Sequence, residues 1–155
     1  MLKYADYDVV FQELPNEVTL AINISNCPNR CVGCHSAYLM DDVGNPLTEQ
    51  ALGELLQTYG KTVTCVCFMG GDREPHAVAQ LAHWVKTQAA FTLKVGWYSG
   101  KQTLPEVFDS QWFDYVKVGP YVPKLGGLNH KTTNQRLYKI TETGTLEDIT
   151  ACFWK

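Results

Sequence analysis

Three closely spaced cysteines constrain this chain more than any other feature of its sequence. Cys27, Cys31 and Cys34 lie within eight residues, separated by three residues and then by two. On an ideal helix, steps of four and three would place the three thiols on one face, so a buried helical cluster is one interpretation. The intervening Pro28 and Gly33, however, are typical of turns and loops. We therefore expect a loop in which the thiols converge, as at a metal centre.

The rest of the sequence predicts a reducing environment for these thiols. The N-terminal residues mix acidic and apolar side chains without a long apolar stretch, so we expect no secretory signal and a cytoplasmic protein. No segment of the sequence approaches the ~18 apolar residues that a membrane-spanning helix needs. In a reducing compartment disulfides are rare, and clustered cysteines more often bind metals or carry out chemistry.

Length and charge narrow the class of protein further. The chain has 155 residues, about one domain when ~150 residues per domain is expected, and we predict a single domain over residues 1–155. Its 13 basic and 16 acidic residues give a net charge of −3. A nucleic-acid-binding domain usually has a basic surface and a pI above roughly 9, so we expect no nucleic-acid partner, and no membrane partner either. Hydrophobic residues make up 45% of the chain, enough for a folded core.

Strand and helix patterns alternate along the chain. Apolar, β-branched segments typical of strands occupy residues 18–24, 63–68, 91–97, 115–118 and 136–140. Helical spacing predicts a helix between Thr48 and Gly60, a second that begins at Pro75 and buries Val78, Leu81, Ala82 and Val85, and a short one around 105–108. Such alternation is typical of α/β proteins with a largely parallel sheet. Four or five units are too few for a closed barrel of ~250 residues, so we predict an open, partial (β/α) barrel or a small parallel sheet.

Two metal sites other than an iron–sulfur cluster fit part of the cysteine motif. Cys31-Val-Gly-Cys34-His35 matches the C-x-x-C-H signature of covalent haem, but that signature belongs mainly to exported proteins and leaves Cys27 unused. Structural zinc needs four ligands, whereas this loop supplies three thiols and a poorly placed His35. A fourth zinc ligand would have to fold back from elsewhere, the candidates being Cys65, Cys67, His76 and His130.

An iron–sulfur cluster accounts best for the three thiols. A four-iron cluster normally takes four cysteines, so a loop that supplies three leaves one iron with an open position. The motif Cys27-x3-Cys31-x2-Cys34 after a strand resembles that of the radical S-adenosylmethionine (SAM) superfamily. The resemblance implies that these cysteines bind a [4Fe–4S] cluster, that SAM binds the fourth iron, and that the fold is a partial, open (β/α) barrel of the radical SAM type. In the superfamily the residue after the third cysteine is usually Tyr or Phe and lies near the adenine. In this chain that residue is His35.

A second motif, Met69-Gly70-Gly71-Asp72, directly follows a predicted strand. Glycines allow close approach to the backbone, and a carboxylate accepts strong hydrogen bonds from an ammonium group. The alternative is an ordinary strand-to-helix turn in which Asp72 caps the helix that begins at Pro75. The motif resembles the Gly-Gly-Glu with which the superfamily holds the SAM ammonium, and the carboxyl ends of parallel strands are where sites collect. The resemblance implies that SAM is lined by Gly33, Cys34, His35, Gly70, Gly71 and Asp72.

Within the superfamily, the chain resembles the small anaerobic ribonucleotide reductase activating proteins. Trp97-Tyr-Ser-Gly100, the segment 113–121 and Thr132-Thr-Asn-Gln-Arg136 carry this resemblance, from which Lys117-Val-Gly-Pro and Arg73-Glu74 depart. It implies that a low-potential donor such as flavodoxin reduces the cluster. SAM is then cleaved to methionine and a 5′-deoxyadenosyl radical, which takes a hydrogen atom from a glycine of the reductase large subunit. The alternatives are another glycyl-radical partner, of the pyruvate formate-lyase type, a small-molecule substrate, or a non-enzymatic zinc-binding module.

Several other residues have two interpretations each. Ser99 is a turn residue or touches SAM, while Lys94 and Lys117 are solvated or pair with its carboxylate. The segment 134–136 faces either a partner or the site. Cys65 and Cys67 share a strand face and are expected to be a buried reduced pair. Packing or docking roles are open for Cys152, and His83 is expected at the surface.

Overall fold

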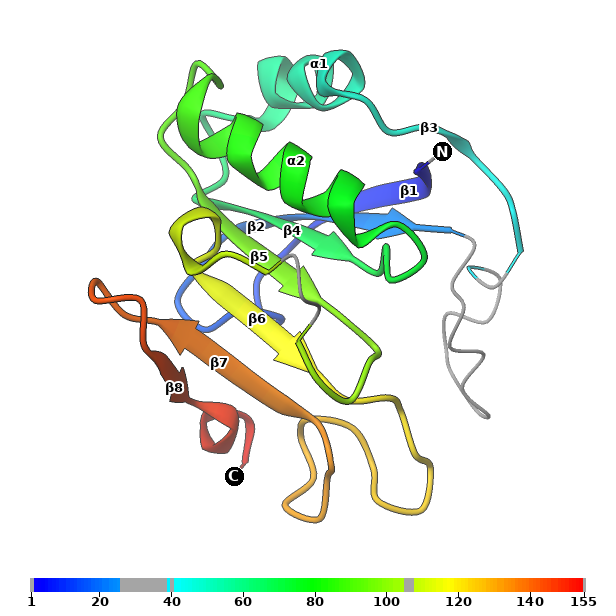
Figure 1. Ribbon diagram of the computed structural model, residues 1–155, viewed down its shortest axis with the longest axis vertical. Helices are drawn as coiled ribbons and strands as arrows, with labels where there is room; N and C mark the ends of the chain where they lie inside the picture. Colours follow the sequence, from blue (N-terminus) through cyan, green and yellow to red (C-terminus); the bar gives the residue numbers. More distant parts are fainter. Residues whose placement is uncertain (1, 26–38, 40, 105–107, 155) are drawn as a thin grey trace.

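The computed structural model describes residues 2–25, 39, 41–104 and 108–154 (Figure 1). Within these ranges the chain forms one mixed, open sheet of eight strands, in the order β3-β1-β2-β4-β5-β6-β7-β8, together with two α-helices. In chain order the elements are β1 (Lys3–Val10), β2 (Thr19–Ile24), β3 (Asn45–Pro46), α1 (Glu49–Tyr59), β4 (Cys65–Met69), α2 (Pro75–Thr87), β5 (Lys94–Tyr98), the short 3₁₀ helix η2 (Ser110–Trp112), β6 (Tyr115–Val118), β7 (Arg136–Ile140), β8 (Leu146–Asp148) and the 3₁₀ helix η3 (Thr150–Phe153).

The centre of the sheet is parallel, as the sequence predicts. Strands β2, β4, β5 and β6 run in the same direction, and Thr19, Cys65 and Lys94 lie side by side at their start. The flanks differ from the prediction, because β1, β3, β7 and β8 pair with their neighbours in antiparallel fashion. The sheet is therefore mixed and only partly parallel.

Both helices begin near their predicted residues. The hydroxyl of Thr48 accepts a hydrogen bond from Ala51 N at 3.1 Å, and α1 ends at Gly60. Helix α2 begins at Pro75 and buries Val78, Leu81, Ala82 and Val85, as predicted. The capping role considered for Asp72 is wrong, because Glu74 occupies the cap position and no side chain caps this helix.

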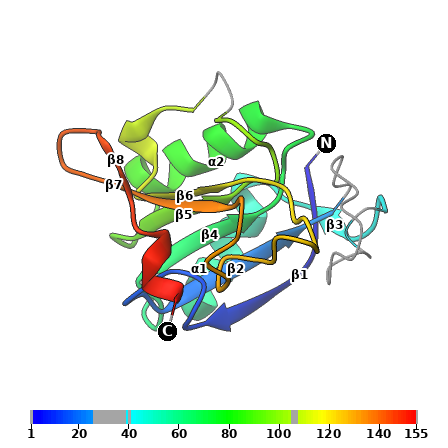
Figure 2. The same cartoon turned by 90° about the horizontal axis from the view of Figure 1, so that it is seen from below.

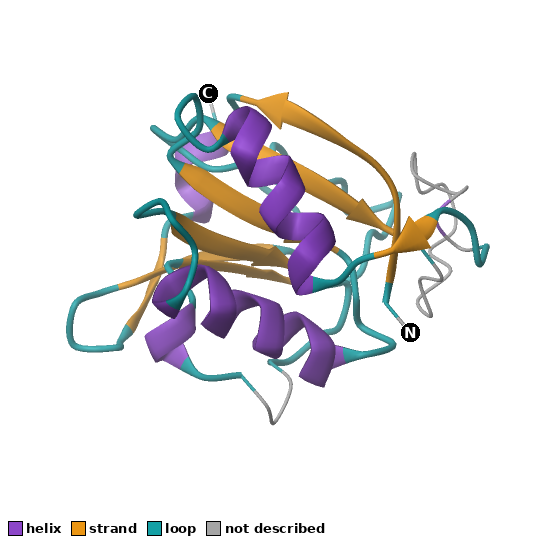
Figure 3. Ribbon diagram, turned by 90° about the horizontal axis from the view of Figure 1, so that it is seen from above, coloured by secondary structure: helices purple, strands orange, loops and turns teal. Residues whose placement is uncertain are grey.

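The two faces of the sheet have different cores. On one face, α1 and α2 cover Phe68, Trp97 and their strand neighbours in the larger hydrophobic cluster (Figure 3). On the other face, Cys65, Cys67 and Tyr115 pack against Leu14 from the segment between β1 and β2. Figure 2 shows α2 and η3 on opposite sides of the strands. Neighbouring residues of one strand contribute to different cores, because successive side chains of a strand point to opposite faces of the sheet.

The parallel strands bring several connecting segments to one edge. Their carboxyl ends meet there with the start of β7, since β7 runs in the opposite direction to β6 (Figure 1). The segments that follow β2, β4, β5 and β6 therefore begin at the same edge, the carboxyl edge. None of the helices described is long and apolar enough to cross a membrane.

Candidate functional site

Gly70 and Gly71 follow β4 at the carboxyl edge and have backbone conformations that favour glycine. Their φ angles are +108° and +90°. A Cβ atom on Gly71 would lie 2.5 Å from Val78 Cγ2, and one on Gly70 would lie 3.2 Å from the carbonyl oxygen of Ile24. These glycines let the turn lie close to α2 and the end of β2, and the expected close approach of a ligand to them stays a prediction. The fold itself requires both glycines.

The carboxylate of Asp72 joins this turn to the one that follows β5. Its Oδ1 accepts a hydrogen bond from Ser99 Oγ at 2.5 Å, and its Oδ2 accepts one from Gly100 N at 2.8 Å. Ser99 is fully buried, and its Oγ in turn accepts a bond from Lys101 N at 3.1 Å. Bonds to an ionised carboxylate are about twice as strong as neutral ones. Ser99 is thus more than the simple turn residue that the sequence suggested.

The backbone of Gly70 is also held by β5. The indole Nε1 of Trp97 donates to Gly70 O at 2.7 Å, and Gly70 N donates to Tyr98 O at 2.9 Å. Trp97 is fully buried, so this indole bond is shielded from water. This role of Trp97 was not predicted from the sequence, although an aromatic residue near the end of a predicted strand was a usable signal.

Lys117 lies at the same edge and is buried, with 8% of its surface exposed. Its Nζ donates to Gly119 O at 2.8 Å and to Ser99 O at 3.2 Å, and it lies 5.9 Å from the centre of the Tyr98 ring. The expectation that this lysine is solvated is therefore wrong. Lys117 lies on β6, an interior strand between β5 and β7, and its amine is bonded to carbonyl oxygens.

Lys94, in contrast, lies at the opposite edge of the sheet. It begins β5, half of its side chain is exposed, and its Nζ lies 2.9 Å from Glu17 Oε2. Lys94 is therefore not brought together with the glycine motif, and the structure excludes it as a partner of a ligand bound there.

The segment 134–136 borders the carboxyl edge, where β7 begins. Asn134 Nδ2 donates to Pro120 O at 3.0 Å, while Gln135 Nε2 makes a long bond of 3.4 Å to Gly119 O. Gln135 is buried, and Arg136 lies 3.7 Å from Asp148 at the side of β8. These contacts attach the segment to the connection that follows β6, and its ligand or partner role stays a prediction.

The cysteines within the described residues lie apart from this edge or are poorly reactive. Cys65 and Cys67 are free, buried and on one face of β4, as predicted. Burial raises the pKa of both thiols, as is typical of inert structural cysteines. Cys152 is exposed, and partial desolvation of its thiol raises the pKa of this group too.

Among the described residues, no three His, Cys, Asp or Glu side chains form a group suited to a metal ion. His83 is exposed and packs edge-on against Trp112.

The predicted cluster ligands Cys27, Cys31 and Cys34, together with Gly33 and His35, lie outside the described residues. The structure does describe the point from which their segment starts. Ile24 ends β2 three residues before Cys27, and Ser25 is anchored by bonds from its N to Lys3 O at 3.0 Å and from its Oγ to Val43 O at 2.5 Å. The described chain therefore reaches the carboxyl edge at Ile24, beside Gly70, three residues before Cys27.

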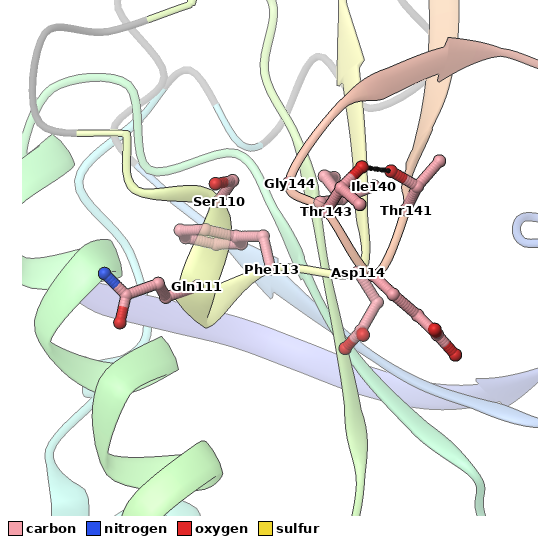
Figure 4. Close-up of a pocket in the computed structure, with 9 residues that line it drawn as sticks. Ser110, Gln111, Phe113, Asp114, Ile140, Thr141, Thr143 and Gly144 are labelled. Atoms are coloured by element: carbon pink, nitrogen blue, oxygen red, sulfur yellow. Dashed lines mark hydrogen bonds between the residues drawn. The ribbon is translucent and has the colours of Figure 1, made fainter.

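Two pockets lie away from this edge. One of about 360 Å³ lies between η2 and the turn after β7, where Ser110, Asp114 and Thr143 contribute to its lining (Figure 4). Asp114 is already held by Lys86 Nζ and by Val95 N, which donates at 2.9 Å. The other, of about 590 Å³, lies between α1 and the end of α2 and is lined in part by Trp84 and Phe91. Neither pocket contains a residue of the two sequence motifs.

Comparison with known proteins adds no relative to this description. The chain matches no protein-family model, no curated protein and no solved structure. The described structure defines an α/β protein with a mixed, open sheet, whose glycine motif and cysteine segment start at one edge.

Proposed function

We propose that this chain is a radical SAM activating enzyme that generates a glycyl radical on the anaerobic ribonucleotide reductase. The proposal includes a [4Fe–4S] cluster held by Cys27, Cys31 and Cys34, and SAM lined by Gly33, Cys34, His35, Gly70, Gly71 and Asp72. It also includes a finer description of the fold, a partial (β/α) barrel of the radical SAM type. Four parallel strands in an open sheet, with both described helices on one face, support that description.

One observation carries the proposal. Gly70 packs against the carbonyl of Ile24, so the Gly-Gly-Asp turn touches the end of the strand from which the cysteine segment starts. In the sequence these two motifs are about 35 residues apart, and the fold brings the second to the end of the strand that directly precedes the first. Their shared position at the carboxyl edge is where α/β sheets usually bind ligands.

The described residues suit the charged groups of the proposed ligand. Asp72 supplies negative charge for an ammonium group, and the buried Lys117 supplies positive charge at the same edge. Both side chains are held by hydrogen bonds from or to neighbouring strand ends, so little reorganisation accompanies binding. When bound, the cluster would supply the electron that cleaves SAM, with the chain providing position and exclusion of water.

The proposal is tested by EPR on anaerobically purified protein, reconstituted with iron and sulfide and reduced. A four-iron signal that changes when SAM is added is expected for the wild type. The Cys31→Ala variant should fold but lose both the SAM effect and radical formation. Cys65→Ala is the matched control, because Cys65 is a buried thiol in the middle of the sheet, and it should keep the SAM effect.

The identity of the partner needs a separate measurement. With flavodoxin as the reductant, a glycyl radical signal on the large subunit of anaerobic ribonucleotide reductase is expected. A signal on pyruvate formate-lyase alone would keep the chemistry and change the partner. Bound zinc without acid-labile sulfide, or an unchanged radical yield in Cys31→Ala, would overturn the proposal.

A further inference from the structure

We propose that Ser99 is a positioning residue for the SAM ammonium group and that it acts through the carboxylate of Asp72. This inference rests on the proposed function and adds a residue from a different strand end to the site. It replaces the two roles that the sequence suggested for Ser99, a turn residue or a direct contact to SAM.

The geometry of the Asp72 carboxylate carries this inference. Each of its two oxygens accepts a bond from the turn after β5, from Ser99 Oγ at 2.5 Å and from Gly100 N at 2.8 Å. Two bonds to two different oxygens set the plane of the carboxylate as well as its position. A carboxylate has about four acceptor positions, and once its plane is set by the turn after β5 the directions of all of them are set too.

The N–H, carbonyl and hydroxyl groups of Ser99 are all hydrogen-bonded. This residue is fully buried, its Oγ accepts from Lys101 N at 3.1 Å, and its N donates to Lys117 O at 2.8 Å. Its carbonyl oxygen accepts from Lys117 Nζ at 3.2 Å. Because the hydroxyl already accepts one bond and donates another, its role is to orient Asp72 rather than to bind a ligand directly.

The same turn also holds Gly70, the residue next to β2. Trp97 and Tyr98, which directly precede Ser99, bond to the carbonyl and the N–H of Gly70. The end of β5 thus sets both the backbone and the acid of the Gly-Gly-Asp turn. Small errors in the position of a binding group are costly, so loss of the Ser99 hydroxyl should weaken binding without unfolding the chain.

The test is a double-mutant cycle on the anaerobic, cluster-loaded full chain, with equilibrium binding of S-adenosylhomocysteine as the readout. This probe keeps the ammonium and carboxylate groups but is not cleaved. Ser99→Ala is expected to bind it about tenfold more weakly, and Asp72→Asn at least as weakly. The double variant should be within about twofold of Asp72→Asn, because the two side chains act as one unit.

A second probe separates positioning from a general loss of structure. The deaminated analogue of S-adenosylhomocysteine lacks the group that Asp72 is proposed to bind. Ser99→Ala should bind this analogue as well as the wild type does, within about twofold. Equal weakening for both probes would show that Ser99 only supports the fold, and would overturn the inference.

A matched control lies at the other end of the same strands. Thr64 Oγ1 donates to the buried carboxylate of Glu17 at 2.7 Å, so Thr64→Val also removes a hydroxyl-to-carboxylate bond. It should leave the affinity for S-adenosylhomocysteine unchanged. If the Ser99→Ala variant binds the probe as tightly as the wild type does, this inference alone is overturned. If the wild type neither binds the probe nor shows a SAM-dependent EPR change, the proposed function is overturned.

Discussion

The two edges of the central parallel strands each have a carboxylate that receives several hydrogen bonds, but the two are built differently. At the amino edge, Glu17 accepts bonds from Lys94 Nζ at 2.9 Å, Tyr115 Oη at 2.8 Å and Thr64 Oγ1 at 2.7 Å. At the carboxyl edge, Asp72 accepts bonds from the hydroxyl of Ser99 and the N–H of Gly100. Glu17 thus has a lysine as ion-pair partner, while Asp72 is bonded to the ends of a turn.

The backbone also differs between the two edges. At the carboxyl edge Gly70 and Gly71 have positive φ, which glycine adopts without a steric cost, whereas at the amino edge Asn16, next to Glu17, has a φ of +65°. The bonding pattern favours a stabilising role for the cluster at the amino edge, and it supports the binding site proposed at the carboxyl edge.

The largest expected effect is on stability, from Glu17→Ala. This change removes the carboxylate that accepts bonds from Tyr115 and Thr64, and hydrogen bonds to a charged group are worth about 1.5–3 kcal/mol each, so the two together contribute about 3–5 kcal/mol. The lost pair with Lys94 adds less, because half of that side chain is exposed. We expect a decrease of this size in the free energy of unfolding, measured by urea titration. Binding of S-adenosylhomocysteine at low denaturant should be unchanged, and a parallel loss of affinity would contradict the division between the edges.

Gly71→Ala should be next in size. The change forces alanine to a φ of +90° and puts its Cβ 2.5 Å from Val78. Strained backbone and overpacking each cost about 1–3 kcal/mol, so we expect a loss of about 2–4 kcal/mol, measured by thermal unfolding. Gly53→Ala is the control, because it lies within α1 with its Cβ at an ordinary 3.5 Å from Trp84, and it should be neutral or stabilising. Equal losses in the two variants would refute this explanation.

Trp97→Phe should have a smaller effect on stability and a clear one on binding. It removes the donor to Gly70 O, and an unsatisfied buried acceptor costs about 1–3 kcal/mol. We expect weaker binding of S-adenosylhomocysteine, because the turn next to β2 loses one of its supports. Trp84→Phe, at a half-buried position of α2, is the control and should bind the probe normally. Normal binding in both variants would mean that the indole bond does not serve the site.

The smallest expected effect is a pH dependence at the amino edge. Burial alone would raise the pKa of Glu17, but the bonds from Lys94, Thr64 and Tyr115 lower it below its ordinary value of 4.5. A carboxyl group with a lowered pKa in the folded state stabilises the protein above the unfolded-state value, and this contribution is lost as the pH falls through the folded-state value. The ordinary pKa of a glutamate carboxyl group is 4.5. As the pH falls below about this value, the difference in unfolding free energy between wild type and Glu17→Gln should therefore become smaller. A difference that stays constant down to pH 2 would show that ionisation of Glu17 is irrelevant.

Local patterns in the sequence were sufficient for the central elements. Strands β2, β4, β5, β6 and β7 and helices α1 and α2 all lie within a few residues of their predicted bounds. Apolar side chains at strand or helix spacing must be buried, so the period alone indicates these elements. The shared face of Cys65 and Cys67 followed from the same rule.

Three of the flanking strands, β1, β3 and β8, were not predicted, for a physical reason. β1 contains Asp6 and Asp8 and is only partly buried, while β3 has two residues and β8 has three. Such short or half-exposed strands have no apolar period, and they form because a neighbouring strand offers free hydrogen-bonding groups. Pairing of this kind depends on the assembled sheet.

What the sequence by itself determined is the set of central elements and the position of the Gly-Gly-Asp motif directly after a strand. Only the tertiary structure decided what Asp72, Ser99 and Lys117 do. The bond between Asp72 and Ser99 joins residues 27 positions apart, and the bond from Lys117 to the carbonyl oxygen of Ser99 joins residues 18 positions apart. Periodicity reports how a residue relates to its own helix or strand, whereas these contacts arise only when separate strand ends are brought to one edge.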